Sequence, residues 1–502
     1  MMVRAGLLRA VVRTSSAPTS APTEDWSLLM SDTMTDRLLH HLFPGDHDEH
    51  GAVILATEVR TPGGRRLLAR ELVLAQDGVD YVPGKRGYRM LTGAFVTQQI
   101  VRCRDGGLAY LAVHNHGGRD SVAFSGDDLA SQARGYPSLL DINRGRPVGA
   151  LVFAENAVAG RLWLSAEQQL PLRIMRAVGE SFRTLVPSPV PRPQRRPLAY
   201  DRQARLFGDR GQDLLRGIKV GVIGAGGVGS LVVEYLARLG VGSFVIADPQ
   251  RVELTNVPRI TGATRGDARA ILTRAGGPAW LRALGERLAT PKVAVMRRLI
   301  RRANPEARVE AIMGDFVDDD VARRFVDCDY LFLAADTMQA RLVFNAIVHA
   351  YLIPGVQMGA KVIVDPTSGD IGDVFCVSRP VTPSRGCLLC NSLISPTGLQ
   401  REAESAAERR SQRYVDDEGV AAPSVITLNA QAASHAVNDF LFAVTGLRNK
   451  GASVGYIRSD ARRRRTVVEE PRRDPNCPQC GAIPGQGAFA RGDAAPLYTR
   501  SR

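Results

Sequence analysis

The sequence predicts an α/β protein of two domains: an α+β domain, then a Rossmann-like, doubly wound and mostly parallel sheet. Three observations lead to this prediction: the length of 502 residues, a proline-rich break between two long ordered stretches, and the alternation of strands and helices after the break. Hydrophobic content of 44% and charged content of 23% are ordinary for a globular protein. No apolar run approaches the roughly 18 residues that span a bilayer, so we do not expect a membrane protein.

Composition divides the chain into five segments. The break, VPSPVPRPQRRP, is rich in proline, which removes backbone donors and favours an extended chain. The first residues carry Arg and Ser but lack the apolar run of a secretory signal. We expect a disordered leader at 1–29, an N-terminal domain at 30–185, a linker at 186–199, a C-terminal domain at 200–481 and a loose tail at 482–502.

The net charge of +14 and the pI near 9.8 favour anionic partners. The arginines are spread along the chain, many of them in the linker and in 462–465, and no basic helix is interleaved with aromatic residues. We therefore do not expect a nucleic-acid-binding protein. Of the seven cysteines, four form two C-x-x-C pairs and the others are scattered, which argues against a disulfide framework. This usage predicts a reducing, cytoplasmic location.

Four segments of the N-terminal domain are expected to be strands, and a capped helix is expected from Asp127 onward. The strands are GAVILATEV (51–59), RELVLA (70–75), AFVTQQIVRCR (94–104) and GLAYLAVHNH (107–116). His114 and His116 end the last of them, and their spacing places both imidazoles on one side of an extended chain. Two histidines plus a carboxylate can bind zinc and leave an open position for water.

The stretch HNHGGRDSVAFSGDDLASQARGYPSLLDI resembles the JAB/MPN (JAMM) metalloprotease family, which has an early Glu, then H-x-H-P and S-x-x-D. The resemblance implies an α+β domain with catalytic zinc on His114, His116 and Asp128. It further implies that Ser125 supports the oxyanion or the bound water and that Glu49, before the strand GAVILA, is the general base.

Several points of this resemblance stay open. Gly117 replaces the usual proline, and the spacing from His116 to the serine is one residue longer than usual. Asp127 keeps the usual distance from His116, whereas Asp128 keeps the usual distance from the serine. Glu58, at the far end of the first strand, is an alternative base. A further alternative is a non-catalytic scaffold.

A nucleotide-binding βαβ unit is predicted between Lys219 and Asn256. An apolar run is followed by Gly224, Gly226 and Gly229, by a helical segment up to Leu239, and by a second apolar run that ends on Asp248. In such units the amides at a helix N-terminus hold phosphate and a carboxylate holds a ribose hydroxyl. The unit alone is compatible with NAD as well as with ATP, so a nicotinamide-dependent oxidoreductase is an alternative at this point.

Four further segments, in this order, resemble the ubiquitin-activating or ThiF/MoeB-like adenylating superfamily. They are YDRQARLFG, DPQRVELTNVPR, ATPKVAVMRRLIRRANPEARVEA and AADTMQARLVFNAI. The resemblance implies that the glycine turn and Asp248 bind ATP, that Asn256, Arg259 and Lys292 contact the triphosphate, and that Asp336 holds Mg²⁺. Arg202 resembles an arginine that reaches the ATP of a partner subunit, which implies a homodimer. NVPRI departs from the usual N-L-x-R-Q, and 261–290 is longer than the family's connection.

Two C-x-x-C pairs form a candidate structural zinc site, because four thiolates leave no position open. They are Cys387 with Cys390 and Cys477 with Cys480. MoeB-like proteins carry this arrangement, and a redox-active pair is the alternative. Many ubiquitin-activating enzymes also use a crossover cysteine for a thioester, but 391–424 contains none. Cys328 and Cys376 are expected to be buried and Cys103 lies in the other domain, so no thioester is expected.

The predicted function is ATP-dependent adenylation of the C-terminal glycine carboxylate of a ubiquitin-like protein, joined to a zinc peptidase that processes or deconjugates the same protein. The cofactors are ATP, Mg²⁺ and two Zn²⁺, one catalytic and one structural. The partners are a ubiquitin-like or sulfur-carrier protein ending in Gly, a conjugating-type protein and a second copy of the chain. Sulfur-carrier activation for cofactor biosynthesis is an alternative that uses the same chemistry.

Overall fold

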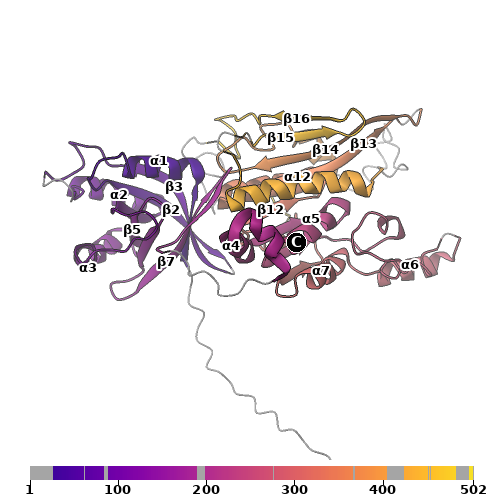
Figure 1. Cartoon of the computed structure of the whole chain (residues 1–502), viewed down its shortest axis with the longest axis horizontal. Helices are drawn as coiled ribbons and strands as arrows, with labels where there is room; N and C mark the ends of the chain where they lie inside the picture. The colour runs from indigo at the N-terminus through magenta and orange to yellow at the C-terminus, as the bar shows by residue number, and fades with distance from the viewer. Residues whose placement is uncertain are drawn as a thin grey trace, which may run out of the picture.

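Two eight-stranded sheets lie side by side in the computed structural model, one from each half of the chain (Figure 1). The structure describes residues 26–61, 63–83, 89–188, 198–274, 276–365, 368–403, 423–449, 452, 454–481 and 497–500. The predictions for 1–25 and for 189–197 of the linker lie outside these residues. Within the described part, no helix is long and apolar enough to cross a membrane.

The N-terminal sheet has the order β1-β3-β2-β4-β5-β6-β7-β8, and β1 also pairs with β7, so the sheet curls back on itself. Its elements are β1 (Trp26–Ser31), α1 (Asp32–Leu42), β2 (Gly51–Thr61), β3 (Gly64–Leu74), α2 (Gly93–Gly106), β4 (Ala109–Asn115), α3 (Gly126–Ile142), β5 (Val148–Phe153), β6 (Val158–Trp163), β7 (Gln169–Val178) and β8 (Phe182–Leu185). The predicted strands at 51–59, 70–75 and 107–116 are confirmed as β2, β3 and β4. The predicted helix from Asp127 is α3.

The predicted strand at 94–104 is wrong, because this segment is helix α2. Its buried side chains, Phe95, Gln99, Ile100 and Cys103, recur at helical spacing on one face. The side chain of Thr92 accepts a hydrogen bond from the Phe95 amide at the N-cap, and Gly107 ends the helix in the left-handed conformation at φ 69°. The β-branched residues of the segment suggested a strand, but the caps and the 3.6-residue period decide the conformation.

Strand structure is present before the predicted boundary at residue 30. Strand β1 starts at Trp26, whose side chain is fully buried, and Ser31 caps the following helix α1 by accepting from the Met34 amide. The expected leader at 1–29 therefore includes four residues of a central strand. The expected loose tail is also too long, since Leu497 is buried and Arg500 pairs with Asp318 in a β-bridge.

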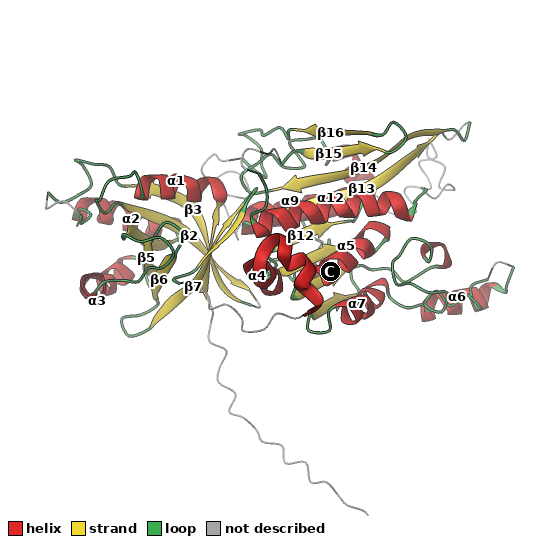
Figure 2. Ribbon diagram, viewed as in Figure 1, coloured by secondary structure: helices red, strands yellow, loops and turns green. Residues whose placement is uncertain are grey.

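The C-terminal sheet has the order β11-β10-β9-β12-β13-β14-β15-β16. Strands β9 to β13 pair in parallel, as predicted, whereas β14, β15 and β16 extend the sheet in antiparallel pairing. Figure 2 shows helices on both sides of the parallel part. The elements are η1 (Leu198–Tyr200), α4 (Asp201–Gly217), β9 (Lys219–Ile223), α5 (Gly227–Leu239), β10 (Ser243–Ala247), η2 (Leu254–Asn256), α6 (Ala279–Leu288), α7 (Lys292–Ala303), β11 (Arg308–Ile312), α8 (Asp319–Ala322), β12 (Tyr330–Leu333), α9 (Met338–Tyr351), β13 (Gly355–Val364), β14 (Ile371–Val381), α10 (Pro396–Ala403), α12 (Ile426–Thr445), β15 (Tyr456–Asp460) and β16 (Arg465–Glu469).

The two sheets are joined through a shared apolar cluster and a buried ion-pair network. Leu29, Val59 and Phe182 belong to the same buried cluster as the core of the C-terminal sheet. Arg66, 8% exposed, donates to three backbone carbonyls at 326–328 and lies 3.3 Å from Asp329. The network holds the far end of the β2–β3 hairpin against the amino ends of β9 and β12.

Replacing Arg66 with Met is expected to destabilise the protein by about 3–5 kcal/mol, because buried carboxylates and carbonyls lose their donor. Burial alone would raise the pKa of the Asp327 carboxyl, but the Arg66 charge and hydrogen bonds from Lys219 and Thr61 outweigh it and lower the pKa. A lowered pKa contributes stability above the unfolded value near 3.8, and this stability is lost as pH falls through the folded value.

Urea unfolding of Arg66→Met at neutral pH measures the loss, with Arg60→Met as control because Arg60 is an exposed residue of the same hairpin. Equal unfolding midpoints for Arg66→Met and the wild type would show that the network contributes nothing. In the wild type we expect the free energy of unfolding to decrease on acidification below pH 4, partly through Asp327.

Candidate functional site

The glycine turn lies at the carboxyl end of β9, where the strand order reverses between β10 and β12. Gly224 has φ +93°, in the left-handed region. A Cβ on Gly229 would lie 1.9 Å from the Gly224 carbonyl oxygen, so only glycine lets α5 approach the strand this closely. Such a reversal is where open α/β sheets bind nucleotides, and the first amides of α5 face it.

Asp248 and Lys292 are brought together beside this turn. Asp248 is 6% exposed and accepts hydrogen bonds from the Ala225 amide at 2.7 Å and the Gln250 amide at 2.8 Å. Lys292 begins α7, is 5% exposed, and donates through Nζ to Gln250 Oε1 at 2.5 Å. Gln250 is neutral, so among the described residues the buried ammonium has no paired carboxylate. A buried cation without a counter-charge favours an anionic ligand.

The other predicted nucleotide contacts lie around the same turn, with one exception. Asn256 is 3% exposed in η2, and the Arg259 carbonyl lies 3.6 Å from the position of a Cβ on Gly227. Asp336 is exposed and directly follows Ala335, whose amide lies 3.1 Å from a Cβ placed on Gly224. Arg202 is exposed on α4, and no described contact links it to the turn.

His114, His116 and Asp128 form a compact donor set at the end of β4. The two Nε2 atoms are 3.2 Å apart, and Asp128 places one oxygen 3.2 Å from His114 Nε2 and the other 3.3 Å from His116 Nε2. Ligands about 2.0–2.1 Å from a tetrahedral zinc ion are separated by roughly 3.3–3.4 Å, so each of these three distances is close to that of a pair of zinc ligands. The two contacts of Asp128 use different oxygens of its carboxylate. Among the described residues, no fourth metal-binding side chain belongs to this set.

Glu49 and Ser125 flank this donor set. Glu49 Oε1 lies 3.9 Å from His116 Nε2, and burial raises the pKa of its carboxyl. Ser125 caps α3, accepts from the Asp128 amide and donates to Asp128 Oδ2 at 2.8 Å. Burial would raise the pKa of the Asp128 carboxyl, but His114 and Ser125 outweigh it and hold the pKa well below its usual range. The carboxylate is therefore ionised and ready to bind a cation.

The sequence offered one alternative to Glu49 and one to Asp128, and both alternatives lie away from the donor set. Glu58 pairs with Arg65 at 2.6 Å toward the other end of β2. Asp127 is exposed on the first turn of α3 and is absent from the described donor set. Geometry thus favours Glu49 over Glu58 and Asp128 over Asp127.

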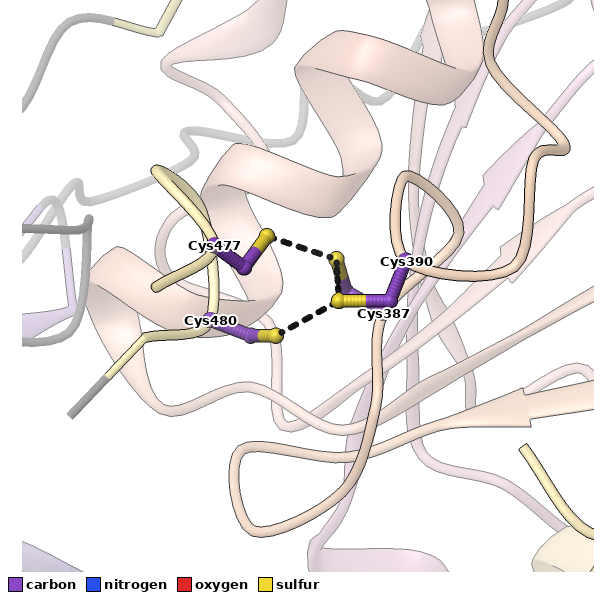
Figure 3. A group of neighbouring side chains, drawn as sticks. All are labelled: Cys387, Cys390, Cys477 and Cys480. Atoms are coloured by element: carbon purple, nitrogen blue, oxygen red, sulfur yellow. Dashed lines mark hydrogen bonds between the residues drawn. The ribbon is translucent and has the colours of Figure 1, made fainter. Parts of the chain in front are cut away.

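The four cysteines of the C-x-x-C pairs meet in space although 90 residues separate the pairs (Figure 3). Sulfur to sulfur distances are 3.7 Å for Cys387–Cys390, 3.6 Å for Cys387–Cys477 and 3.4 Å for Cys390–Cys480. Zn–S bonds of about 2.3 Å in a tetrahedron separate the sulfurs by roughly 3.8 Å, so the cluster fits zinc. Four mutually close thiols also favour a metal site over a two-cysteine redox pair.

Cys480→Ser is expected to remove one equivalent of zinc and to lower the melting temperature by several degrees, because the metal closes a loop of 90 residues. Elemental analysis and a thermal melt check this. A full zinc content in Cys480→Ser would contradict the four-thiolate site.

The three remaining cysteines are fully buried, which confirms the prediction for Cys328 and Cys376. Burial raises the pKa of the Cys103 thiol to about 12 and also raises the pKa values of the other two. Neutral, buried thiols are poor nucleophiles.

Two residues of these sites were missed from the sequence. Gln250 holds Lys292 through both its backbone carbonyl and its side chain, and its place two residues after Asp248 was the available signal. Asn345 of α9, fully buried, accepts from the Leu388 amide at 3.0 Å and lies 3.4 Å from Gln479, so it touches both cysteine hairpins. No local pattern marks Asn345.

The sequence profile of the ThiF family matches residues 200–481, more than half of the chain. This chain belongs to the ThiF family. The match contains the glycine turn, Asp248, Lys292 and all four clustered cysteines. It begins after the N-terminal sheet, so the family match says nothing about the histidine site.

Among ThiF-like relatives, the tRNA threonylcarbamoyladenosine dehydratase of Escherichia coli (strain K12) is 30% identical over 174 residues, 34% of this chain and 57% of that protein. The sulfur carrier protein ThiS adenylyltransferase of Bacillus subtilis (strain 168) is 29% identical over 215 residues, 40% of this chain and 56% of that protein. The chain thus spans somewhat more than half the length of these relatives. The crystal structure of E. coli MccB with ATP aligns with 57% of this chain and 75% of that chain at 19% identity and a TM-score of 0.41.

Proposed function

We propose that this chain uses ATP to adenylate the C-terminal glycine carboxylate of a ubiquitin-like or sulfur-carrier protein. The observation that carries the proposal is Lys292, a buried ammonium without a described carboxylate partner, beside a glycine turn at the switch point of a ThiF-family sheet. The named activity of the ThiS adenylyltransferase supports a carrier protein as substrate.

The reaction needs alignment and charge neutralisation more than covalent help from the protein. A carboxylate oxygen of the carrier attacks the α-phosphorus, the bond from that phosphorus to the bridging oxygen breaks, and pyrophosphate leaves. The amides of the glycine turn, Arg259 and Lys292 would neutralise the phosphates, and Asp248 would orient the ribose. Asp336 would hold Mg²⁺, which supplies further charge neutralisation.

Pyrophosphate exchange into ATP tests the proposal. A panel of carrier proteins ending in glycine is incubated with the chain, ATP and Mg²⁺, and exchange is expected with at least one member. Absence of exchange with every member, together with tight binding of NAD, would instead support the oxidoreductase alternative.

We further propose a zinc peptidase at His114, His116 and Asp128, acting on extensions or conjugates beyond the same glycine. The zinc-like spacing of these donors and the nearby Glu49 favour this second activity. Zinc held there would lower the pKa of a bound water and polarise the scissile carbonyl. Glu49 would take the proton of the water, a role that its raised pKa suits. A scaffold without activity would bind zinc but cleave nothing.

The two sites lie on opposite sides of the junction between the sheets. The histidine site adjoins Gly51, whereas Thr61, at the other end of β2, contacts Asp327 at the amino end of the C-terminal sheet. Eleven strand residues span roughly 35 Å, and the glycine turn lies beyond this, at the carboxyl ends of β9 and β12. A short carrier tail therefore has to leave one site before it enters the other.

A homodimer through the C-terminal half is part of the proposal because exposed Arg202 has no described role within one chain. Sedimentation of the protein at micromolar concentration tests it. A conjugating-type protein could receive the activated carrier, and sulfur transfer uses the same adenylate.

A further inference from the structure

Helix α6 carries an apolar stripe that faces away from the rest of the protein. Trp280, Leu284 and Leu288 follow one another at four-residue intervals and are 69%, 41% and 51% exposed. Ile271, in the turn before the helix, is 86% exposed. Figures 1 and 2 show α6 at the end of the molecule opposite the N-terminal sheet. We name the three side chains of the helix the α6 stripe.

The preceding segment, 267–273, packs against α6 and holds it in place. Leu272 and Thr273 pack on Gly285, where a Cβ would approach within 2.7–2.8 Å. Arg269 donates to the Leu288 carbonyl at 2.9 Å, and the Thr290 amide donates to the Asp267 carbonyl at 2.8 Å. The exposed apolar side chains of the stripe therefore lie on an ordered helix. This order lowers the entropic cost of binding a partner.

The charges around the stripe are mainly positive. Between 261 and 290 the chain has five arginines, and no described residue forms an ion pair with them: Arg265, Arg269, Arg274, Arg282 and Arg287. Of the two carboxylates in the segment, Asp267 is paired with Arg298, and Glu286 is exposed on the side of α6 opposite the stripe. Arg287 lies on the stripe side of α6, one turn after Leu284. A partner that complements this surface is apolar at its centre and acidic at its rim.

The charges also decide between classes of partner. A second copy docked through the same stripe would place Arg287 and Arg269 against like charges, which is unfavourable. Single-stranded nucleic acid stacks on several aromatic rings, and the stripe has one. A folded acidic protein can cover the aliphatic side chains with an apolar patch and pair its carboxylates with the arginines.

The last residue of the stripe lies close to the nucleotide site along the chain. Three residues separate Leu288 from Lys292, and the Val252 amide and the Arg251 side chain bind the carbonyls of Thr290 and Ala289 at 2.9 Å and 2.7 Å. Four extended residues span at most about 14 Å, and the ten residues of α6 span about 15 Å. A tail of roughly four to eight residues could thus reach the phosphates from a protein docked on α6.

We infer that the α6 stripe docks the folded body of the carrier protein, through an apolar patch rimmed with carboxylates, while the carrier's tail reaches the ATP beside Lys292. This inference rests on the proposed adenylation and adds a specificity surface to it. Full-length carriers should bind through both elements, whereas the isolated tail uses only the nucleotide site.

Trp280 provides a direct readout, because the other two tryptophans, Trp26 and Trp163, are 0% and 3% exposed. The probes are the folded glycine-ending carriers of the exchange panel, each paired with a synthetic peptide of its last six residues. We expect the folded carrier, without ATP, to protect Trp280 from acrylamide quenching. The double variant Leu284→Ser and Leu288→Ser should lose this protection, and Val468→Ser, an exposed apolar position on β16, should keep it.

In the exchange assay the double variant should raise the KM for the folded carrier about tenfold or more. The kcat and the KM for the peptide should stay within twofold. An unchanged KM for the folded carrier would overturn the inference, and so would an equal rise for carrier and peptide. Protection of Trp280 by phosphatidylglycerol vesicles, by tRNA or by self-association, with none from the carrier, would also overturn it. Exchange without protection refutes the docking surface alone, whereas protection without exchange refutes the proposed adenylation alone.

Discussion

Lys292→Met should reduce carrier-dependent pyrophosphate exchange by about 10²–10³-fold. Methionine keeps the volume and the apolar contacts of the lysine stem but removes the only charge that this buried position offers to the phosphates. Because Lys292 is 5% exposed and its described side-chain partner is a neutral amide, water cannot replace the lost charge.

The matched control is Arg297→Ala, which removes one positive charge from an exposed position of the same helix. It should leave exchange within twofold of the wild type. A Lys292→Met enzyme within fivefold of the wild type would show that the lysine is a structural partner of Gln250 and not a ligand of ATP. A change of similar size in Arg297→Ala would indicate general electrostatics instead of a specific contact.

Glu49→Gln should reduce cleavage of a carrier extended beyond its terminal glycine by about 10²–10⁴-fold while zinc stays bound. The amide cannot take a proton from the zinc-bound water, but Glu49 lies outside the three-atom donor set. His116→Ala should lose both cleavage and one zinc equivalent. Cleavage is followed by mass spectrometry and zinc by elemental analysis.

The control is Glu58→Gln, which changes the other candidate carboxylate on the same strand. Its ion pair with Arg65 is remote from the histidines, so cleavage should be unaffected. Full cleavage by Glu49→Gln, or loss of cleavage in Glu58→Gln, would contradict the assignment. Zinc binding without any cleavage by the wild type would support the scaffold alternative.

Local sequence patterns predicted the parts of the fold that depend on neighbouring residues. The glycine turn, α5 and the strands on either side follow from apolar runs and glycine spacing within about 30 residues, and they were predicted correctly. Segment 94–104 was not, because the β-branched and apolar residues that fill the buried face of α2 are compatible with a strand. The Thr92 and Gly107 caps were the overlooked signals.

Contacts between distant segments could not be read from the sequence. The pairing of β1 with β7 and the Arg66 network each join residues more than a hundred positions apart. Within the sites, motifs supplied residues that belong to one strand or one helix, such as His114 with His116. Asn345 acts through folded geometry, so no spacing marked it, whereas the place of Gln250 two residues after Asp248 was a signal that was overlooked. The α6 stripe has helical spacing, but only the structure shows that nothing within the described chain covers it.

The most direct test of the adenylation proposal is the intact mass of the carrier after incubation with the chain, ATP and Mg²⁺. We predict a mass increase equal to AMP less one water, formed only when the carrier ends in a free glycine carboxylate and formed about 10²–10³-fold more slowly by Lys292→Met. An unmodified carrier accompanied by ADP, or a mass increase of a single phosphoryl group, would contradict the account.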